Sequence, residues 1–208
     1  SRGLGDVYKR QDKTYTCTRC GAQKTQVLKA LYSGTCGAEG DGSNVTWTLD
    51  NTGTLTISGN GAMYSYWNTG IVGFNTPWRN LMVKHVIIQD GVTSIGSYAF
   101  IYNHTIESVE ISGTVQTIEG NAFQGTHLKS VTIPDNVTSI GREAFQDCTS
   151  LKNIALSNGV QHLGYVFGGC TALESVTIPS GVTSMGSTFE GCTCLLYTSD
   201  AADEGLGV

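Results

Sequence analysis

VTIPDNVTSIGREAFQDCTSLKN (131–153) is the stretch that decides the fold. It begins with a short alternating segment, Val131-Thr132-Ile133, continues through a turn to Val137 and Ile140, and reaches Phe145 a few residues later. Related copies start at Val86, Val109, Ile154 and Val176, so that successive starts are 22 or 23 residues apart. Self-similarity at a fixed period of this length indicates an array of stacked supersecondary units.

Each of the five units carries the same apolar residue types at the same places. A valine follows the turn, at Val92, Val115, Val137, Val160 and Val182; an aliphatic residue comes next, at Ile95, Ile118, Ile140, Leu163 and Met185; a phenylalanine follows, at Phe100, Phe123, Phe145, Phe167 and Phe189. One unit cannot bury enough apolar area to offset roughly 1.5 kcal/mol per ordered residue, whereas stacked units cover one another. We therefore expect parallel strands about 4.8 Å apart, with phenylalanine stacked on phenylalanine inside the coil.

A glycine follows the aliphatic position in four of the units, at Gly96, Gly141, Gly164 and Gly186, and we expect it to permit a sharp bend. The second unit has Glu119 there and Gly120 one residue later. Either a positive φ is not required at this position, or that turn is shifted by one residue.

The chain ahead of the repeats has a different pattern. VTWTLDNTGTLTIS (45–58) predicts two alternating strands around the turn residues 50–53. The aromatic residues Tyr64, Tyr66, Trp67, Phe74 and Trp78 follow. Since a first coil would expose its apolar face, an array needs a terminal cap, and we expect residues 36–85 to form a β-rich N-terminal cap. Residues 12–35 are expected to be the end of an upstream module.

Neither end of the chain fits the repeat. DVYKRQ (6–11) and CLLYTS (194–199) can be encoded by one short DNA element in opposite orientations, and that element resembles the mosaic end of transposase-based sequencing adapters. We therefore expect residues 1–11 and 194–208 to be adapter-derived and disordered, and leave them out of the fold prediction. On this interpretation the chain is a gene fragment, and its last repeat, within 86–193, is truncated.

LKSVTIPDNVTSIGREAFQDC (128–148) resembles the BspA-like leucine-rich repeat family, whose pattern is roughly LxxVxIPxxVTxIGxxAFxxC. The segment 36–63, together with Thr76-Pro77-Trp78, is similar to the segment that often precedes these repeats in secreted and surface proteins of bacteria. The resemblance implies a leucine-rich repeat solenoid of short parallel β-strands joined by turns or short helices. It also implies an extracellular or cell-surface bacterial protein that binds other molecules, in some members as an adhesin, and it brings no catalytic residues.

The charge and hydrophobicity of the chain limit the classes of partner that we expect it to bind. The net charge of −5 at pH 7 gives no electrostatic footprint for nucleic acid or an anionic membrane. No apolar run approaches the roughly 20 residues of a bilayer span, so we expect no membrane insertion within this chain.

Cys17 and Cys20 form a CxxC motif followed by Gly21. This is half of a zinc-ribbon signature; a four-ligand site needs two more ligands, which could lie upstream of the present sequence. The alternatives are a disulfide or free thiols. A structural zinc here is the one cofactor that the sequence suggests.

Cys148, Cys170 and Cys192 occupy one repeat position, and we expect them to pack in the core as small apolar residues. His104 and His127 also share a position and could stack on adjacent coils, where exposed turn residues are the simpler interpretation than a metal site. No histidine has a nucleophile and a carboxylate at a spacing that suggests a catalytic triad.

The outward face of the strands is the usual binding surface of a curved solenoid. Alternation places on it His85, Ile87, Ser108, Glu110, Ser130, Thr132, Asn153, Ala155, Ser175 and Thr177. This surface is small, polar and nearly uncharged; it lacks the aromatic and arginine anchors of a strong protein hot spot, and simple solvation of each residue is the competing interpretation. Cap aromatics that stay exposed are a rival contact site.

These observations predict a non-enzymatic surface or secreted domain that mediates adhesion or recognition of an unidentified protein or glycan ligand. The alternatives are a structural spacer in a cell-wall protein and an accessory region of a larger wall-active enzyme.

Overall fold

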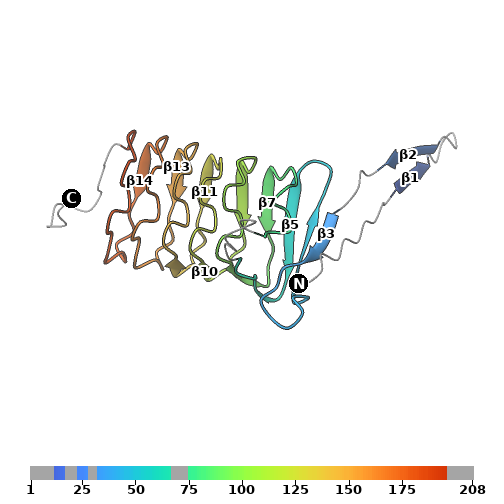
Figure 1. Cartoon of the computed structure of the whole chain (residues 1–208), viewed down its shortest axis with the longest axis horizontal. Coiled ribbons are helices and arrows are strands. Elements are labelled where there is room, and N and C mark those ends of the chain that lie inside the picture. The colour runs from blue at the N-terminus through green and yellow to red at the C-terminus, as the bar shows by residue number, and fades with distance from the viewer. Residues whose placement is uncertain (1–11, 17–22, 28–31, 67–74, 196–208) are drawn as a thin grey trace.

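The computed structural model describes residues 12–16, 23–27, 32–66 and 75–195. In this part of the chain the backbone forms short β-strands joined by turns and bends, and it contains no helix. Figure 1 shows the repeats as coils stacked along the long axis of the molecule. The predicted solenoid of parallel strands is confirmed, and its connections are turns rather than short helices.

One strand of each coil lies where the alternating segment predicts it. β5 (Thr54–Gly59), β7 (His85–Ile88) and β9 (Ser108–Ile111) pair in parallel. Further along the stack, β11 (Ser130–Thr132), β13 (Asn153–Ala155) and β14 (Ser175–Thr177) also pair in parallel. In both groups, residues at the same position of the repeat are paired across adjacent strands.

A second strand in the coil was not predicted. β6 (Gly61–Ala62), β8 (Val92–Ile95), β10 (Thr117–Ile118) and β12 (Ser139–Ile140) form another parallel sheet, in the order β12-β10-β8-β6. Its residues lie in the stretch interpreted from the sequence as a turn followed by an aliphatic residue. The two inward positions, such as Val137 and Ile140, are separated by two exposed residues rather than one, which hides the period of two that identifies a strand.

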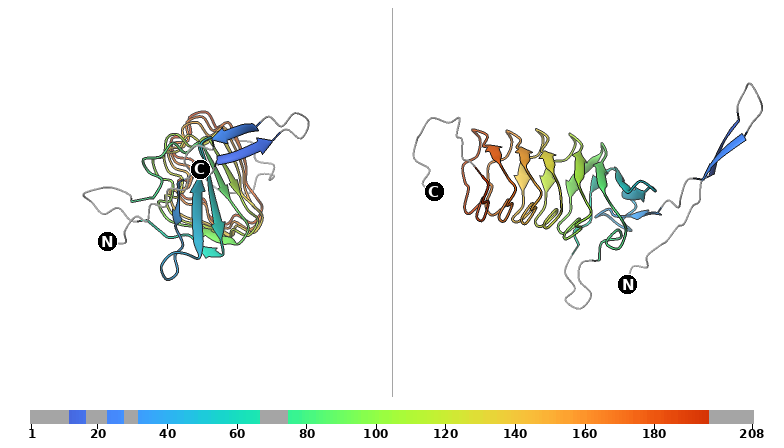
Figure 2. Two further views of the ribbon diagram at one scale, coloured as in Figure 1. Left: turned by 90° about the vertical axis from the view of Figure 1, so that its right-hand side faces the viewer. Right: turned by 90° about the horizontal axis from the view of Figure 1, so that it is seen from above.

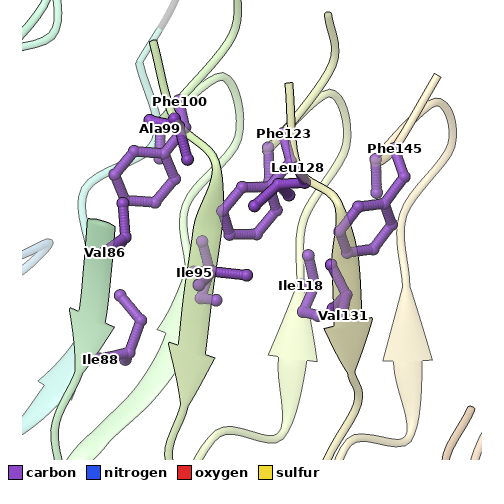
Figure 3. Close-up of a cluster of buried hydrophobic side chains, with 14 of the residues drawn as sticks. Val86, Ile88, Ile95, Ala99, Phe100, Ile118, Phe123, Leu128, Val131 and Phe145 are labelled. Atoms are coloured by element: carbon purple, nitrogen blue, oxygen red, sulfur yellow. The ribbon is translucent and has the colours of Figure 1, made fainter. Parts of the chain in front are cut away.

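The core is a column of stacked aromatic rings, as predicted (Figure 3). Ring centroids are 5.0 Å apart for Phe100 and Phe123 and 5.3 Å apart for Phe123 and Phe145, with interplanar angles of 16° and 6°. The column continues through Phe167 and Phe189. At its other end Trp78 stacks on Phe100 at 5.4 Å. The aromatic column therefore begins inside the segment predicted as cap.

None of the glycines after the aliphatic position has a positive φ, so of the two alternatives raised by Glu119 the first holds, and a positive φ is not required there. A Cβ on Gly96 would lie 2.2 Å from the Tyr64 carbonyl oxygen, and one on Gly141 would lie 2.4 Å from the Gly120 nitrogen. These two glycines allow neighbouring coils to approach closely. The positive φ angles fall two residues before each phenylalanine, at Tyr98, Asn121, Glu143, Tyr165 and Ser187, and two residues after it, at Tyr102, Gly125, Asp147, Gly169 and Gly191.

The cap contains the predicted hairpin. β4 (Val45–Leu49) pairs antiparallel with β5, and the Asp50 carboxylate accepts hydrogen bonds from the backbone N–H groups of Thr52 and Thr54 in the turn. β3 (Tyr32–Thr35) pairs antiparallel with β4 although it precedes residue 36, where the cap was expected to begin. β1 (Asp12–Thr16) and β2 (Gln23–Val27) form an antiparallel pair of their own (Figure 2).

The same sheet therefore holds the cap and the first coils, since β5 pairs with the cap on one edge and with β7 on the other. Trp47 on β4 packs edge-on against Trp78, at 5.8 Å between ring centroids. Residues from cap and coils thus share one continuous core.

Glu119, the residue that replaces the repeat's glycine, joins the cap to the coils. Its carboxylate accepts hydrogen bonds from the hydroxyls of Ser65, Ser94 and Ser97 and from the backbone N–H of Ser97. Burial by itself raises the pKa of Glu119, but the hydrogen bonds from Ser65, Ser97 and Ser94 outweigh it, so the pKa lies below its ordinary value. Glu119, which departs from the repeat, thus forms a polar connection to Ser65 in the cap, 54 residues earlier in the chain.

Replacing Phe145 by alanine is expected to lower the free energy of unfolding by about 3–5 kcal/mol, because it leaves a cavity between two buried rings. Urea denaturation followed by circular dichroism measures the change. Phe145→Leu, which keeps most of the volume, should cost clearly less. A loss below about 1 kcal/mol for the alanine variant would contradict the stacked core.

Replacing Glu119 by glutamine is expected to cost about 1 kcal/mol at pH 7, less than for a fully buried charge, because the carboxylate is only partly buried. A group with a lowered folded-state pKa stabilises the fold above its unfolded pKa, and this contribution disappears as pH falls through the folded pKa. The difference between wild type and variant should therefore vanish in acid. Glu110→Gln, at an exposed position, is the control and should cost less at pH 7 than Glu119→Gln.

Candidate functional site

The predicted face forms two columns, which the strand register fixes from β7 to β9 and, in a separate sheet, from β11 to β14. His85, Ser108, Ser130, Asn153 and Ser175 form the first; Ile87, Glu110, Thr132, Ala155 and Thr177 form the second. Ile87 and Ser108 are half-buried, and the other eight are exposed. His85 Nδ1 lies 2.8 Å from Ser108 Oγ, so a hydrogen bond runs along the first column. The result is a flat face of mainly short side chains on hydrogen-bonded strands.

A charged column borders this face and was not predicted. Lys84, Glu107, Lys129, Lys152 and Glu174 each come directly before a strand of the face. Lys129 Nζ lies 2.6 Å from Glu107 Oε2, and Lys152 Nζ lies 3.4 Å from Glu174 Oε1. The hydrogen bond and charge of Lys129 hold the pKa of Glu107 below its ordinary value. The same 22- or 23-residue spacing that revealed the phenylalanines would have revealed this column.

The histidines of the repeats pack as a pair. The His104 and His127 rings have centroids 5.4 Å apart, and His104 Nδ1 lies 2.7 Å from the Gly125 carbonyl oxygen. Within the described residues, no group of three or more His, Cys, Asp or Glu side chains could hold a metal ion. Cys17 and Cys20 lie outside the described residues, and their zinc half-site stays a prediction.

The cysteine column packs as predicted. The thiols of Cys148, Cys170 and Cys192 each donate to a phenylalanine carbonyl oxygen 25 residues earlier, with sulfur–oxygen distances of 3.2, 3.1 and 3.2 Å. Cys148 and Cys170 are fully buried. In the cap, burial raises the pKa of the Cys36 thiol to about 12. Cys36, Cys148 and Cys170 are all buried, so solvent and reagents do not reach these thiols in the folded chain.

The cap offers the rival contact surface. An open hollow of about 570 Å³ lies beside the hairpin turn, lined by Tyr32, Met82 and Lys84 among others. Tyr32 is 41% exposed and Met82 66% exposed, so this part of the cap presents large apolar side chains to solvent. The hairpin and the turn at Asn80–Met82 together form the hollow, and spacing along the sequence does not relate these two segments.

Comparison with known proteins identifies the family. The model of the BspA type leucine rich repeat region matches residues 76–195 in six copies, which is more than half of the chain. The chain belongs to this family. The match begins at residue 76, ahead of the five units found from the sequence, and so includes Trp78, which is also the first ring of the aromatic column.

Several solved structures are similar to this BspA-type chain. A leucine-rich repeat protein of Bacteroides ovatus shares 22% identity, with 76% of this chain and 55% of that one covered and a TM-score of 0.48. One from Bacteroides capillosus shares 26% identity over 83% of this chain and 95% of that one, with a TM-score of 0.40. The T. pallidum leucine-rich repeat protein shares 20%, covering 76% and 96%, with a TM-score of 0.43. A search of curated proteins gave no match.

This BspA-type chain thus spans about half of the B. ovatus protein. Among the residues that the structure describes, no helix has the length and hydrophobicity needed to cross a bilayer.

Brief treatment of the native protein with iodoacetamide is expected to alkylate Cys194, which is exposed, and to spare Cys36, Cys148 and Cys170. The reagent does not reach these three thiols, because they are buried in the folded chain. Peptide mass spectrometry reads out each site, and the same treatment in denaturant should label all of them. Equal labelling of Cys148 and Cys194 in the native protein would contradict the packed cysteine column.

Proposed function

We propose that this BspA-type repeat domain is a non-enzymatic recognition module of a secreted or surface-attached bacterial protein, and that its two outward strand columns contact a protein or glycan ligand. The observation that carries the proposal is the register that sets ten outward side chains at fixed places on hydrogen-bonded strands. Binding to such a surface costs little conformational entropy, because the backbone is already ordered.

Family membership supports this function, since stacked repeats form extended surfaces that bind other molecules. The charged column places charges of alternating sign beside the face, first at Lys84, Glu107 and Lys129 and then at Lys152 and Glu174. A charge pattern of this kind selects partners and sets orientation more than it adds affinity. The spacer and wall-enzyme alternatives remain open, and they require no ligand for this face.

The test is a screen of the whole chain against arrays of extracellular proteins and glycans, repeated with two double variants. Thr132→Glu with Ala155→Glu places two carboxylates on the face. Thr138→Glu with Gln161→Glu places the same charges on the same two coils but away from the face, and all four positions are exposed. We expect the first variant to lose about tenfold or more in affinity for the ligand found, which corresponds to roughly 1.4 kcal/mol.

The control variant should bind as the wild-type chain does. Equal binding by both double variants would show that the ligand binds somewhere other than the strand face. Absence of any ligand across both arrays would favour the structural spacer.

A further inference from the structure

Two histidine side chains from adjacent coils lie next to each other, outside the strand columns. His104 and His127 each come four residues after the phenylalanine of their coil, and both are exposed. Their ring centroids are 5.4 Å apart, and the ring planes are tilted by 41° instead of lying parallel. Backbone hydrogen bonds join the two coils beside them, such as the one from the Tyr102 N–H to the Gln124 carbonyl oxygen at 2.7 Å. The two imidazoles are therefore held close together by an ordered backbone.

The His104 ring has a defined tautomer. Its Nδ1 lies 2.7 Å from the Gly125 carbonyl oxygen. A carbonyl oxygen can only accept, so Nδ1 carries a proton and donates it, and in the neutral ring Nε2 keeps its lone pair. A histidine that binds a metal ion through one nitrogen usually donates its other N–H to a carboxylate, a backbone carbonyl or water. The bond to Gly125 therefore orients the His104 ring with Nε2 available as a ligand atom.

The remaining ring nitrogens have no competing partner. Within the part of the chain that the structure describes, His104 Nε2 and both ring nitrogens of His127 make no hydrogen bond or ion pair. The exposed His127 ring can thus turn about its side-chain bonds and present either nitrogen, whereas the His104 ring is held by Gly125. The pair combines one fixed ligand with one adjustable ligand.

The separation of the two rings matches a tetrahedral ion. Zinc binds an imidazole nitrogen at about 2.0–2.1 Å, and that nitrogen lies about 1.15 Å from the centre of its ring, so two rings that point at one tetrahedral ion have centres about 5.2 Å apart. The same bonds at a right angle would bring the ring centres to about 4.5 Å. The 5.4 Å between the His104 and His127 centroids is close to the tetrahedral value.

Two protein ligands leave the other positions of such an ion to water. The described residues include no group of three or more His, Cys, Asp or Glu side chains that could enclose a metal ion. A site made by this pair is therefore open, unlike the closed four-ligand sites that stabilise a fold. Imidazole nitrogen without thiolate or carboxylate is a ligand for Zn²⁺, Cu²⁺ and Ni²⁺ and a poor one for Mg²⁺ or Ca²⁺.

We propose that His104 and His127 together bind one divalent transition-metal ion, with Zn²⁺ as the ion whose geometry fits, through His104 Nε2 and one ring nitrogen of His127. Water occupies the other positions of the ion. The site shares no residue with the strand columns, so it does not depend on the function proposed for them. It is also separate from the zinc half-site predicted at Cys17 and Cys20. The competing interpretation is a pair of imidazoles that only pack against each other.

The repeat itself supplies the substitutions that test this site. Thr149 and Thr171 stand four residues after the phenylalanine in the next two coils. His104→Thr and His127→Thr therefore each remove one imidazole from an exposed position and introduce a residue type that other coils carry there. His162→Thr makes the same change at an exposed histidine outside the pair.

Thiolates also bind zinc, so their contribution has to be removed. Cys17, Cys20 and Cys194 are replaced by serine in every sample, which leaves the full chain and all four histidines in place. Zinc bound by these samples then depends on the histidines and not on a thiol.

Titration of the full chain with Zn²⁺, followed by calorimetry and by NMR of the histidine ring nitrogens, tests the proposal. We expect one ion per chain and shifts of the His104 and His127 nitrogens that grow together, while those of His85 and His162 stay unchanged. His104→Thr and His127→Thr should each weaken zinc binding by about 100-fold, the low end of what a second linked contact adds to affinity. His162→Thr should bind zinc as the unchanged histidine pair does.

Unchanged zinc affinity in either His104→Thr or His127→Thr would overturn the proposal. Shifts confined to one of the two rings would also overturn it, because the ion would then have a single histidine ligand. Equal shifts of all four histidines would show binding to isolated surface imidazoles, and no zinc binding at all would show a pair that only packs; both results would contradict the proposed site. A ligand for the strand columns, found or not, changes none of these outcomes.

Discussion

The backbone hydrogen bonds between adjacent coils are the constraint on which the rest of the molecule depends. The N–H of Phe100 donates to the Ala122 carbonyl oxygen at 2.8 Å, that of Phe123 to Ala144 at 2.8 Å, and that of Phe145 to Val166 at 3.1 Å. Because each bond joins one coil to the next at a fixed offset, every repeat position becomes a straight column. The aromatic core, the cysteine column and the outward strand columns all result from this one register.

Columns of this kind could be predicted from the sequence wherever one residue type recurs. The phenylalanines and the cysteines were placed correctly, and eight of the ten outward strand positions are exposed, because each depends only on the period and on alternation. The second strand of the earlier coils was missed, since Val137 and Ile140 are both buried and two exposed residues separate them. The close approach of neighbouring backbone to Gly96 and Gly141 was not predicted, because it leaves no mark in the local sequence.

Contacts between unlike segments were the least predictable. Glu119 departs from the repeat in a way visible in the sequence, but its partner Ser65 lies in the cap. A small hollow lies between the turn at Thr76–Asn80 and residues 100–103 of the first coil, and no period relates these two segments. By the same reasoning, a strand such as β3 (Tyr32–Thr35) is short and mainly polar, and its pairing with β4 is defined by the sheet that it joins rather than by its own residues.

The first coil is where the regular pattern is broken at a cost. Two residues after its phenylalanine it has Tyr102 at φ 51°, where three other coils have glycine, and a bulky residue in this conformation costs on the order of 1–2 kcal/mol. The next residue, Asn103, leaves a buried amide without an acceptor, where the following coil has a threonine that pairs with its own backbone. Other coils carry the same kind of cost, since Glu143, Tyr165 and Ser187 also have positive φ angles. The stacking of coils offsets these local costs, because the neighbours on either side hold each coil in place.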